Sequence, residues 1–394
     1  MRLLFVADGR SPIALNWIEY FLSSGDEVHL VSTFDSIPDP RLASYTFLPA
    51  AFSGLKQHKS SPDNRAANLV LSKGIWSDAA VGLRTALRQR LGPLTLPAAA
   101  RRLRAHIDAI SPDLVHAMRI PYEGMLAALA RATPPLLLSV WGNDFTLHAP
   151  STRLMRHYTH LTLSRAAALH ADCRRDVRLA REWGFPAERL AFVLPGAGGV
   201  QTELFTPPEE IIQAPLAVQP RGVRAYVQNR IFFQAIPLVL QSCPQAHFIC
   251  PNMADEPQIL AWVRELGLQR AVELLPRQTR AQMADLFRKA RVVISPTTHD
   301  GTPNTLLEAM ACGCVPVVGD LESVREWITP GENGLLTALN EPEPLAQAIL
   351  QALQDDDLCA RAREINLRLV AQRAAYERVM AQARQFYQQI IASG

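Results

Sequence analysis

Residues 291–318 read "RVVISPTTHDGTPNTLLEAMACGCVPVV", and this stretch decides the fold. The β-branched run at residues 292–296 predicts a strand, and residues 297–305 are polar and turn-forming. A helical apolar pattern begins near residue 305, and a second β-branched run ends the stretch. Strand, loop, helix and strand in this order are typical of a parallel sheet, whose ligands bind beyond the carboxyl ends of the strands.

The same alternation of strands and helices runs through the rest of the chain. Strand-like segments before residue 205 are "LLFVAD", "EVHLVST", "DLVHAM" and "PLLLSVWG", and later ones are "PLAVQ", "AHFIC", "AVELLP" and "VPVVGD". Continuously apolar strands indicate parallel sheets covered by helices on both faces. The sequence therefore predicts an α/β protein with two Rossmann-like, doubly wound domains facing a cleft.

A segment rich in glycine and proline separates the two series of strands. It reads "VLPGAGGVQTELFTPPEEIIQAP" at residues 193–215, which indicates a linker. We expect an N-terminal domain at residues 1–205 and a C-terminal domain at residues 206–373. A final helix, residues 374–394, is expected to pack back on the N-terminal domain and to limit rotation about the linker near residues 196–208.

The bulk composition is that of a soluble globular protein. The 394 residues are 48% hydrophobic and 20% charged, and no uncharged apolar stretch is long enough to cross a membrane. The start, "MRLLFVADGRSP", reads as a core strand and not as a signal peptide. The six cysteines show neither disulfide nor zinc spacing, which favours a cytoplasmic protein. A net charge of +3 gives no argument for nucleic-acid binding.

The opening stretch carries two acidic residues, Asp300 on the loop and Glu308 one turn inside the following helix. Backbone N–H groups of residues 301–305 and of the helix start are suited to a phosphate. Asp300 would then reach whatever the phosphate carries, and Glu308 could accept two hydrogen bonds from a diol. The alternative is that Asp300 is a turn residue and Glu308 a solvated helix residue.

The spacing of these two acids resembles the glutamate-x7-glutamate signature of family 4 glycosyltransferases. "AMACGCVPVV" and "REWITPGENGLL" follow it, "LPGAGGVQTELFTP" resembles the family's linker, and "AVELLPRQTRAQMADLFRKARVVISPT" resembles its nucleotide-binding stretch. "VHAM" and "SVWGNDF" are similar to the ends of two N-terminal strands. The resemblance implies the GT-B fold and a retaining enzyme that uses nucleotide sugars, with the C-terminal half covered best.

The resemblance also implies roles for the residues of the C-terminal half. Glu308 would bind the ribose hydroxyls, and Asp300, one methylene shorter than the family's glutamate, would contact the donor sugar. The family's basic Gly-Arg and lysine are replaced by "PRGVRAYVQNR", where Arg221 and Arg230 would neutralise the diphosphate and Arg224 is a substitute for either. The remaining donor-binding residues would be Gly301, Thr302, Asn304, Thr305 and Arg277.

In the N-terminal half the sequence departs further from the family. The usual histidine at the end of "PLLLSVWG" is replaced by Trp141, with Asp144 after it, and His116 ends the preceding strand. We expect Asp144 to act in catalysis with Asp300 and Glu308, and Trp141 and His116 to lie on the acceptor side. The floor of the acceptor site is expected at Asp8, Gly9, Arg10 and Ser11.

These residues predict a retaining glycosyltransferase of envelope polysaccharide or glycolipid synthesis, with a UDP- or GDP-linked sugar as donor and a glycan or lipid-linked acceptor. Two alternatives stay open. One is another GT-B enzyme, such as a nucleotide-sugar epimerase or a phosphorylase. The other is a catalytically silent homologue that binds nucleotide, which the absent lysine and histidine allow.

No cofactor or metal is expected besides the donor itself. Asp355, Asp356 and Asp357 match an Asp-x-Asp pattern, but they follow a helix in a polar run and are interpreted as a solvated helix end. The pair His157 and His160 lacks a third metal ligand nearby. Helix N-termini and arginines would supply the positive charge that a metal otherwise brings.

A basic segment in the N-terminal half bears on the location of the protein. Between residues 56 and 104 ten lysines and arginines face only two acidic residues, and "VGLRTALRQRLG" places leucines on one helical face and Arg84, Arg88 and Arg90 elsewhere. Such a segment can bind an anionic membrane surface at the inner face. A solvated helix packed on the domain core is the alternative.

Overall fold

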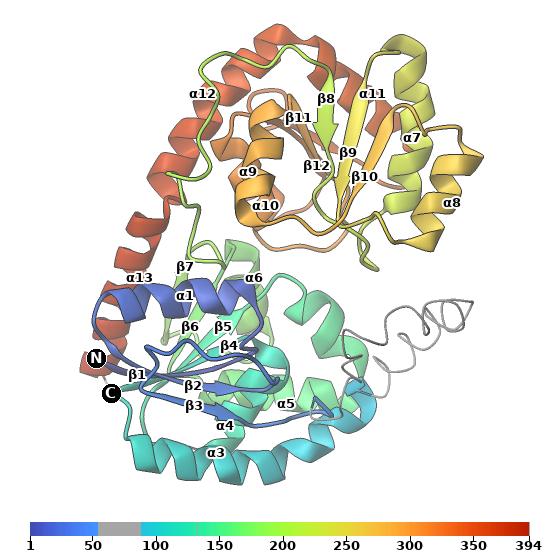
Figure 1. Ribbon diagram of the computed structural model, residues 1–394. Helices are drawn as coiled ribbons and strands as arrows, with labels where there is room; N and C mark the ends of the chain where they lie inside the picture. Colours follow the sequence, from blue (N-terminus) through green and yellow to red (C-terminus); the bar gives the residue numbers. More distant parts are fainter. Residues whose placement is uncertain (54–87, 132, 394) are drawn as a thin grey trace. The chain divides into compact units, whose positions relative to one another are not determined.

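The computed structural model describes residues 1–53, 88–131 and 133–393. Its contacts divide the chain into two compact units, shown in Figure 1. Unit 1 comprises residues 1–171, 176–193 and 384–394, and unit 2 comprises residues 172–175 and 194–383. The boundary expected from the sequence lies after residue 205, whereas in the structure residues 194–205 belong to unit 2.

Unit 1 is built on a seven-stranded sheet in the order β3-β2-β1-β4-β5-β6-β7. Every pair of neighbouring strands is parallel. The order reverses between β1 and β4, and such a switch point opens a crevice at the carboxyl ends of the strands. The strands are β1 (Arg2–Ala7), β2 (Glu27–Ser32), β3 (Ser44–Phe47), β4 (Leu114–Met118), β5 (Leu136–Val140), β6 (Ala168–Ala171) and β7 (Leu190–Val193).

Helices cover both faces of this sheet. One face packs on α3, α4 and α5, and the other packs on α1 and the end of α13, where Trp17, Phe21 and Tyr387 are buried. The helices and short helical turns of unit 1 are α1 (Pro12–Ser23), η2 (Gly92–Thr95), α3 (Leu96–Ile110), η3 (Ile120–Gly124), α4 (Met125–Ala130), η4 (Asp144–His148), η5 (Ala149–Ser151), α5 (Arg153–Arg165) and α6 (Arg174–Glu182).

The first helix shows how local sequence sets these elements. The Ser11 hydroxyl accepts a hydrogen bond from the Ala14 N–H (3.5 Å), Pro12 occupies the first turn, and the chain leaves the helix at Gly25 with φ +75°. The turn therefore needs glycine, because a side chain is strained at this φ. Strand β1, before the helix, is buried over five of its six residues.

Unit 2 has a six-stranded parallel sheet in the order β10-β9-β8-β11-β12-β13. Its order reverses between β8 and β11, which places a second switch point there. The strands are β8 (Leu216–Val218), β9 (His247–Pro251), β10 (Val272–Leu275), β11 (Val292–Ser295), β12 (Val315–Gly319) and β13 (Leu335–Thr337).

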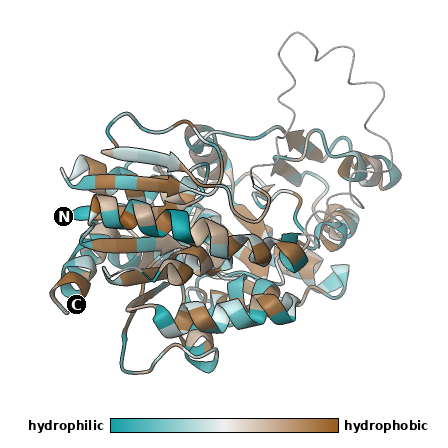
Figure 2. Cartoon of the chain, turned by 90° about the horizontal axis from the view of Figure 1, so that it is seen from below, coloured by the Kyte–Doolittle hydropathy of each residue, from teal (hydrophilic) through white to brown (hydrophobic). Residues whose placement is uncertain are grey.

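Two hydrophobic clusters lie on opposite faces of this sheet. One packs it on α7, α8 and α11, and the other on α9, α10 and the end of α12 (Figure 1). In Figure 2 hydrophobic and hydrophilic residues interleave along the helices, as expected where one side packs on a sheet. The helices are α7 (Asn229–Ser242), α8 (Pro257–Glu265), α9 (Arg280–Lys289), α10 (Asn304–Ala311), η6 (Val324–Glu326), α11 (Pro342–Gln354), α12 (Asp356–Arg373) and α13 (Tyr376–Ser393), whose last residues belong to unit 1.

The end of α13 is held in unit 1 by buried polar contacts. The Arg384 guanidinium pairs with Asp26 (2.8 Å), which also binds the N-terminal ammonium group (2.8 Å). The Tyr387 hydroxyl lies 2.5 Å from His116 Nδ1. Residues 384–393 therefore belong to unit 1, with Tyr387 and Ile390 buried in it.

The segment expected as a linker is fixed to the start of α13. The Val200 N–H donates to the Ala374 carbonyl (2.7 Å), and the Tyr376 N–H donates back to the Val200 carbonyl (2.8 Å). Gly199, at φ +96°, lies so close to the Ala374 carbonyl that a side chain would collide with it. The glycines of this segment thus serve a close backbone approach.

The prediction of two doubly wound α/β units is confirmed. The helix that follows β4 begins only at Met125, because Pro121 and Tyr122 have non-helical backbone angles. Among the described residues, no helix is both long enough and apolar enough to span a membrane.

Candidate functional site

An ion pair spans the switch point of unit 2. Arg221 follows β8, Asp300 follows β11, and Arg221 Nη2 lies 2.5 Å from Asp300 Oδ2. Arg221 Nη1 also donates to the Thr305 hydroxyl (3.3 Å) at the start of α10. Within the described part of the chain, the buried Arg221 Nε has no hydrogen-bond acceptor. The pair therefore offers an unsatisfied donor at the place where sheets of this kind bind ligands.

A buried amide network holds Arg221 in place. The Gln219 side chain accepts from the Arg221 N–H (2.7 Å) and donates to Asn229 Oδ1 (2.7 Å). Asn229 donates in turn to the carbonyl of Gly222 (3.2 Å), which has φ +64°. The loop after β8 is thereby positioned before any ligand arrives.

The loop after β11 is equally well anchored. The Asp300 carbonyl accepts from Arg175 Nη1 (2.7 Å) and from the Ser323 hydroxyl (2.8 Å). The Trp327 indole donates to the Thr302 hydroxyl (3.1 Å). Burial raises the pKa of Asp300, and the Arg221 charge opposes that rise.

Glu308 lies in the second turn of α10 and is mostly buried, with 16% of its side chain exposed. Its closest charged partner is Arg280 Nη2 at 3.7 Å. Burial raises the pKa of Glu308 to about 7, against the opposing charge of Arg280. Because its ion pair with Arg280 is this long, the Glu308 carboxylate can accept hydrogen bonds from the two hydroxyls of a diol.

The structure does not bring every predicted donor-side residue to this place. Gly301, Thr302, Asn304 and Thr305 lie on the loop and the start of α10 as expected. Arg230 and Arg277 are exposed, and within the described chain neither contacts Arg221, Asp300 or Glu308. Arg175 and Arg280 take the nearby positions instead.

Sequence reasoning missed Arg175 and Arg280 for different reasons. The Thr279 and Gln282 side chains form a capping box that places Arg280 at the first position of α9, a signal that the sequence carries. Arg175 lies 125 positions before Asp300 and carries no local signal.

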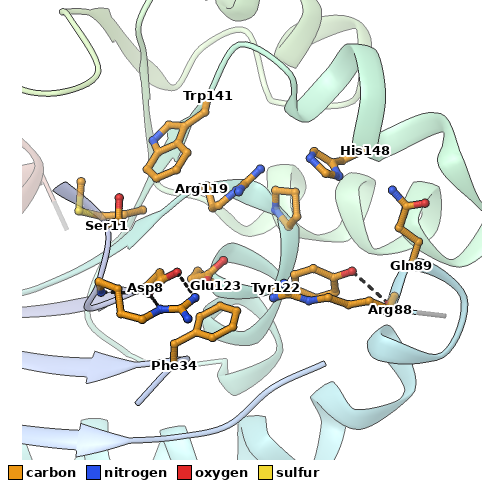
Figure 3. A pocket seen from close by; sticks show the side chains of 13 residues that line it. Asp8, Ser11, Phe34, Arg88, Gln89, Arg119, Tyr122, Glu123, Trp141 and His148 are labelled. Atoms are coloured by element: carbon orange, nitrogen blue, oxygen red, sulfur yellow. Dashed lines mark hydrogen bonds and ion pairs between the residues drawn. The ribbon is translucent and has the colours of Figure 1, made fainter. Parts of the chain in front are cut away.

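Unit 1 has a cavity of about 410 Å³ at its own switch point (Figure 3). Residues after β1 and after β4 form its wall, together with residues from three other segments. The lining residues are Asp8, Arg10, Ser11, Phe34, Arg88, Gln89, Met118, Arg119, Pro121, Tyr122, Glu123, Trp141 and His148.

The predicted acceptor-side residues after β1 lie in or beside this wall. Arg10 pairs with Asp8 through two hydrogen bonds (2.9 and 3.0 Å). Gly9 is packed against Ser32, whose hydroxyl accepts from the Gly9 N–H (2.9 Å), and a side chain at Gly9 would collide with Ser36. Trp141 also lines the cavity, as expected.

Asp144 has a different place from the one expected for a catalytic acid. It is buried and accepts hydrogen bonds from Arg119 Nη2 (2.9 Å), the Ile120 N–H (3.1 Å) and the Trp141 N–H (3.2 Å). Its oxygens are thus occupied by the protein. We correct its expected role to that of a positioning residue for Arg119.

His116 is also removed from the acceptor side. Side chains alternate along β4, so His116 points to the face covered by α1 and α13 and is only 1% exposed. It lies 2.7 Å from the Ser139 hydroxyl and packs against Trp17. His116 is a core residue.

The cavity wall after β4 has an unusual backbone. Arg119 has φ +138° and Tyr122 has φ +70°, values that residues with side chains rarely adopt. Such strain concentrates at functional sites. Burial raises the pKa of Glu123 and lowers the pKa of His148 to about 4. Sequence reasoning missed this "RIPYEG" segment, since it lacks a recognised motif.

Asp355 and Asp356 of the Asp-x-Asp pattern, and His160 of the histidine pair, have structural partners. Asp355 caps α12 by accepting from the Leu358 N–H (2.8 Å), and Asp356 pairs with the buried Arg291 (2.7 Å). His160 stacks on Trp183.

Two family models match the chain. Residues 11–196 match the model described as "Glycosyl transferase 4-like domain", and residues 224–355 match "Glycosyl transferases group 1". Together the matches indicate a glycosyltransferase and support the prediction of a transferase. With its two parallel, doubly wound units, the chain has the GT-B fold.

Curated relatives match parts of the chain. A D-inositol 3-phosphate glycosyltransferase of Corynebacterium urealyticum is 27% identical over 43% of this chain and 44% of its own length. An O-antigen chain mannosyltransferase B of Escherichia coli is 32% identical over 32% of this chain and 26% of its own. The matches therefore span less than half the length of these relatives.

Solved structures match the whole chain in fold. Sucrose-phosphate synthase from Thermosynechococcus elongatus has a TM-score of 0.74 at 16% identity, with 100% of both chains covered. HepE of Anabaena, solved in complex with UDP and glucose, has a TM-score of 0.72 at 17% identity and covers 99% of this chain and 100% of its own. At this identity the likeness shows the fold.

Proposed function

We propose that this chain is a retaining glycosyltransferase that moves a sugar from a UDP- or GDP-linked donor, bound in unit 2, to an acceptor hydroxyl bound in unit 1. The observation that carries the proposal is the Arg221–Asp300 pair at the unit 2 switch point, with Glu308 nearby. A diphosphate gives the unsatisfied Arg221 Nε an acceptor, and a ribose gives Glu308 two hydroxyl donors.

The residues of unit 2 suit the departure of a diphosphate. Arg221 and the first N–H groups of α10 stabilise the negative charge that develops on the leaving group. Asp300 keeps Arg221 neutralised until then and contacts the donor sugar. The acceptor hydroxyl attacks the anomeric carbon from the face that the diphosphate leaves and gives its proton to the departing diphosphate. The sugar therefore keeps its anomeric configuration, as the family resemblance implies.

Envelope polysaccharide or glycolipid synthesis is the process we propose, since the relatives include an O-antigen mannosyltransferase and a phosphatidyl-myo-inositol mannosyltransferase. A cytoplasmic location at the inner membrane face remains a prediction. Most of the basic segment behind it, including Lys56, Lys59 and Arg84, lies outside the described residues. Arg88, expected to lie off the leucine face and to contribute to membrane binding, packs on Phe34 and Tyr122.

The test is a transfer assay with UDP- and GDP-sugars and a panel of glycan and lipid-linked acceptors, with the product's anomeric configuration read by NMR. We expect release of nucleotide diphosphate and retention of configuration. Interconversion of donor sugars without acceptor would indicate an epimerase, and binding of nucleotide without turnover would indicate a silent homologue.

Turnover is proposed to need no divalent metal, because Arg221 and the α10 N-terminus supply positive charge at the diphosphate. We expect the rate to stay within about twofold when EDTA is added. Loss of turnover in EDTA with recovery in manganese would contradict this. Asp355→Asn is a matched control, because it changes one carboxylate of the Asp-x-Asp pattern at the cap of α12. The turnover rate of this variant should equal that of the wild type, with or without EDTA.

A further inference from the structure

We propose that the acceptor bound in the unit 1 cavity carries an anionic group, a phosphate or a carboxylate, held by Arg88 with Arg119 and Trp141. This inference rests on the proposed function only where it calls the bound molecule the acceptor. The residues that line the cavity belong to unit 1, whereas Arg221, Asp300 and Glu308 belong to unit 2.

The first observation is a set of unused donors around one cavity. In the described chain, Arg88 Nε, Arg119 Nε and Trp141 Nε1 are buried and have no hydrogen-bond partner. All three side chains line the cavity (Figure 3). Buried donors without acceptors are costly and uncommon, so three around one cavity point to a ligand rich in acceptor oxygens.

The second observation is the charge of Arg88. Its guanidinium lies over the Phe34 ring (5.0 Å to the centroid) and over the Tyr122 ring (4.5 Å). No carboxylate forms an ion pair with it among the residues that the structure describes. The two rings contact the guanidinium, and its charge has no ion-pair partner in the described part of the chain.

The other charges of the wall are already matched. Arg10 is paired with Asp8, and Arg119 is paired with Asp144. Glu123 accepts from the Thr33 hydroxyl (2.5 Å), and its burial raises its pKa, which favours the neutral form. Arg88 is therefore the cation that a ligand has to balance.

The shape of the wall fits a ring-bearing acceptor with such a group. Phe34, Tyr122 and Trp141 line the cavity, and each has a guanidinium over its ring. The ring edges and the polar groups between them can contact a sugar or polyol ring. A volume of about 410 Å³ holds a molecule of that size. The anionic group then points to Arg88, and the hydroxyls meet the remaining polar groups.

The experiment measures binding to the full chain by calorimetry, without donor. The probes are glucose 6-phosphate, glucuronate and neutral glucose, with inorganic phosphate alone. Vesicles of phosphatidylcholine with and without phosphatidylglycerol form a separate arm. We expect at least one anionic probe to bind about tenfold or more tightly than glucose, and the arm in which this occurs identifies the source of the anion.

Variants of the cavity residues test the inference. Arg88→Gln should weaken binding of the anionic probe about ten- to a hundredfold, and Arg88→Lys should recover part of this loss. Trp141→Phe removes the indole N–H but keeps an aromatic ring, and it should also weaken binding of the anionic probe. Glu123→Gln should leave anion binding intact or stronger. Arg90→Gln, an exposed neighbour, is the control and should change nothing. Circular dichroism checks that each variant is folded.

Equal affinity for glucose and all anionic probes, or unchanged anion binding in folded Arg88→Gln, would overturn the inference. Neither result touches the donor site, which is tested by nucleotide binding and by Glu308→Gln. Absence of donor binding alongside intact anion binding would instead overturn the proposed function.

Discussion

At the scale of single residues, Asp300 and Glu308 have distinct surroundings that predict distinct mutant effects. Asp300 neutralises Arg221 at 2.5 Å, whereas Glu308 has only a distant cation at 3.7 Å. Glu308→Gln should weaken nucleotide diphosphate binding by roughly 1.5–3 kcal/mol, because the ribose loses a charged acceptor. Calorimetry with UDP and GDP measures this loss.

Asp300→Asn is expected to act on turnover instead. It removes the carboxylate that we propose contacts the sugar but leaves Arg221 free to bind phosphate, so the affinity for the bare nucleotide should be kept or increased. Steady-state kinetics should show a fall in kcat. An equal loss of nucleotide affinity in both variants would refute this division of roles.

The raised pKa of Glu308 predicts a pH dependence of donor binding. With a pKa of about 7, only about a tenth of the side chains are ionised at pH 6 and nearly all at pH 8. The diphosphate of a nucleotide sugar does not titrate in this range, so its affinity should rise about tenfold from pH 6 to pH 8. Glu308→Gln should abolish the dependence.

The raised pKa of Glu308 also predicts how the free energy of unfolding changes with pH. Its folded pKa lies above the unfolded value of 4.5, so the folded chain holds this proton more tightly. Glu308 therefore destabilises the fold increasingly as the pH rises from about 4.5 to about 7. Urea unfolding at pH 8 should show Glu308→Gln as more stable than wild type, and a less stable variant would contradict the sign.

At the scale of elements, the loop between β11 and α10 depends on the absence of a side chain at Gly301. A Cβ there would collide with the Asp172 carboxylate. Gly301→Ala should shift the loop and cost about 1–3 kcal/mol of unfolding free energy, along with donor affinity. Gly196→Ala is the control, since its Cβ would lie 3.4 Å from Asp172, an ordinary contact.

The elements also show what sequence could predict. β11 and α10 follow from a β-branched run and a helical apolar pattern, so the Asp300–Glu308 loop could be placed beyond a strand end. Arg221 could be placed at the next strand end by resemblance. The sequence could not predict that Arg175 lies beside Asp300, because this contact depends on long-range packing. It also could not predict the cavity wall at Arg119–Glu123, because that wall depends on strained backbone angles.

The misassigned residues have a common physical cause. His116 and Asp144 both lie at strand ends, where position alone suggests function. Only tertiary contacts decide which side of the sheet His116 faces. They also bring three hydrogen-bond donors to the Asp144 carboxylate.

At the scale of the whole molecule, each unit should respond to its own ligand. Nucleotide diphosphate should slow amide hydrogen exchange in the loops after β8 and β11, and the favoured anionic probe should slow it after β1 and β4. Hydrogen-exchange mass spectrometry resolves these segments. Protection of unit 1 alone by the nucleotide would contradict the assignment of the donor to unit 2.

The passage of α13 from unit 2 into unit 1 bears on protein engineering. A chimera that exchanges donor-binding halves with a single crossover after Val193 would bring in Arg384 and Tyr387 from the second parent. Those residues would then have to match Asp26 and His116 of the first parent. Recombination of this scaffold therefore needs a return crossover before Arg384, so that the unit 1 core is inherited from one parent.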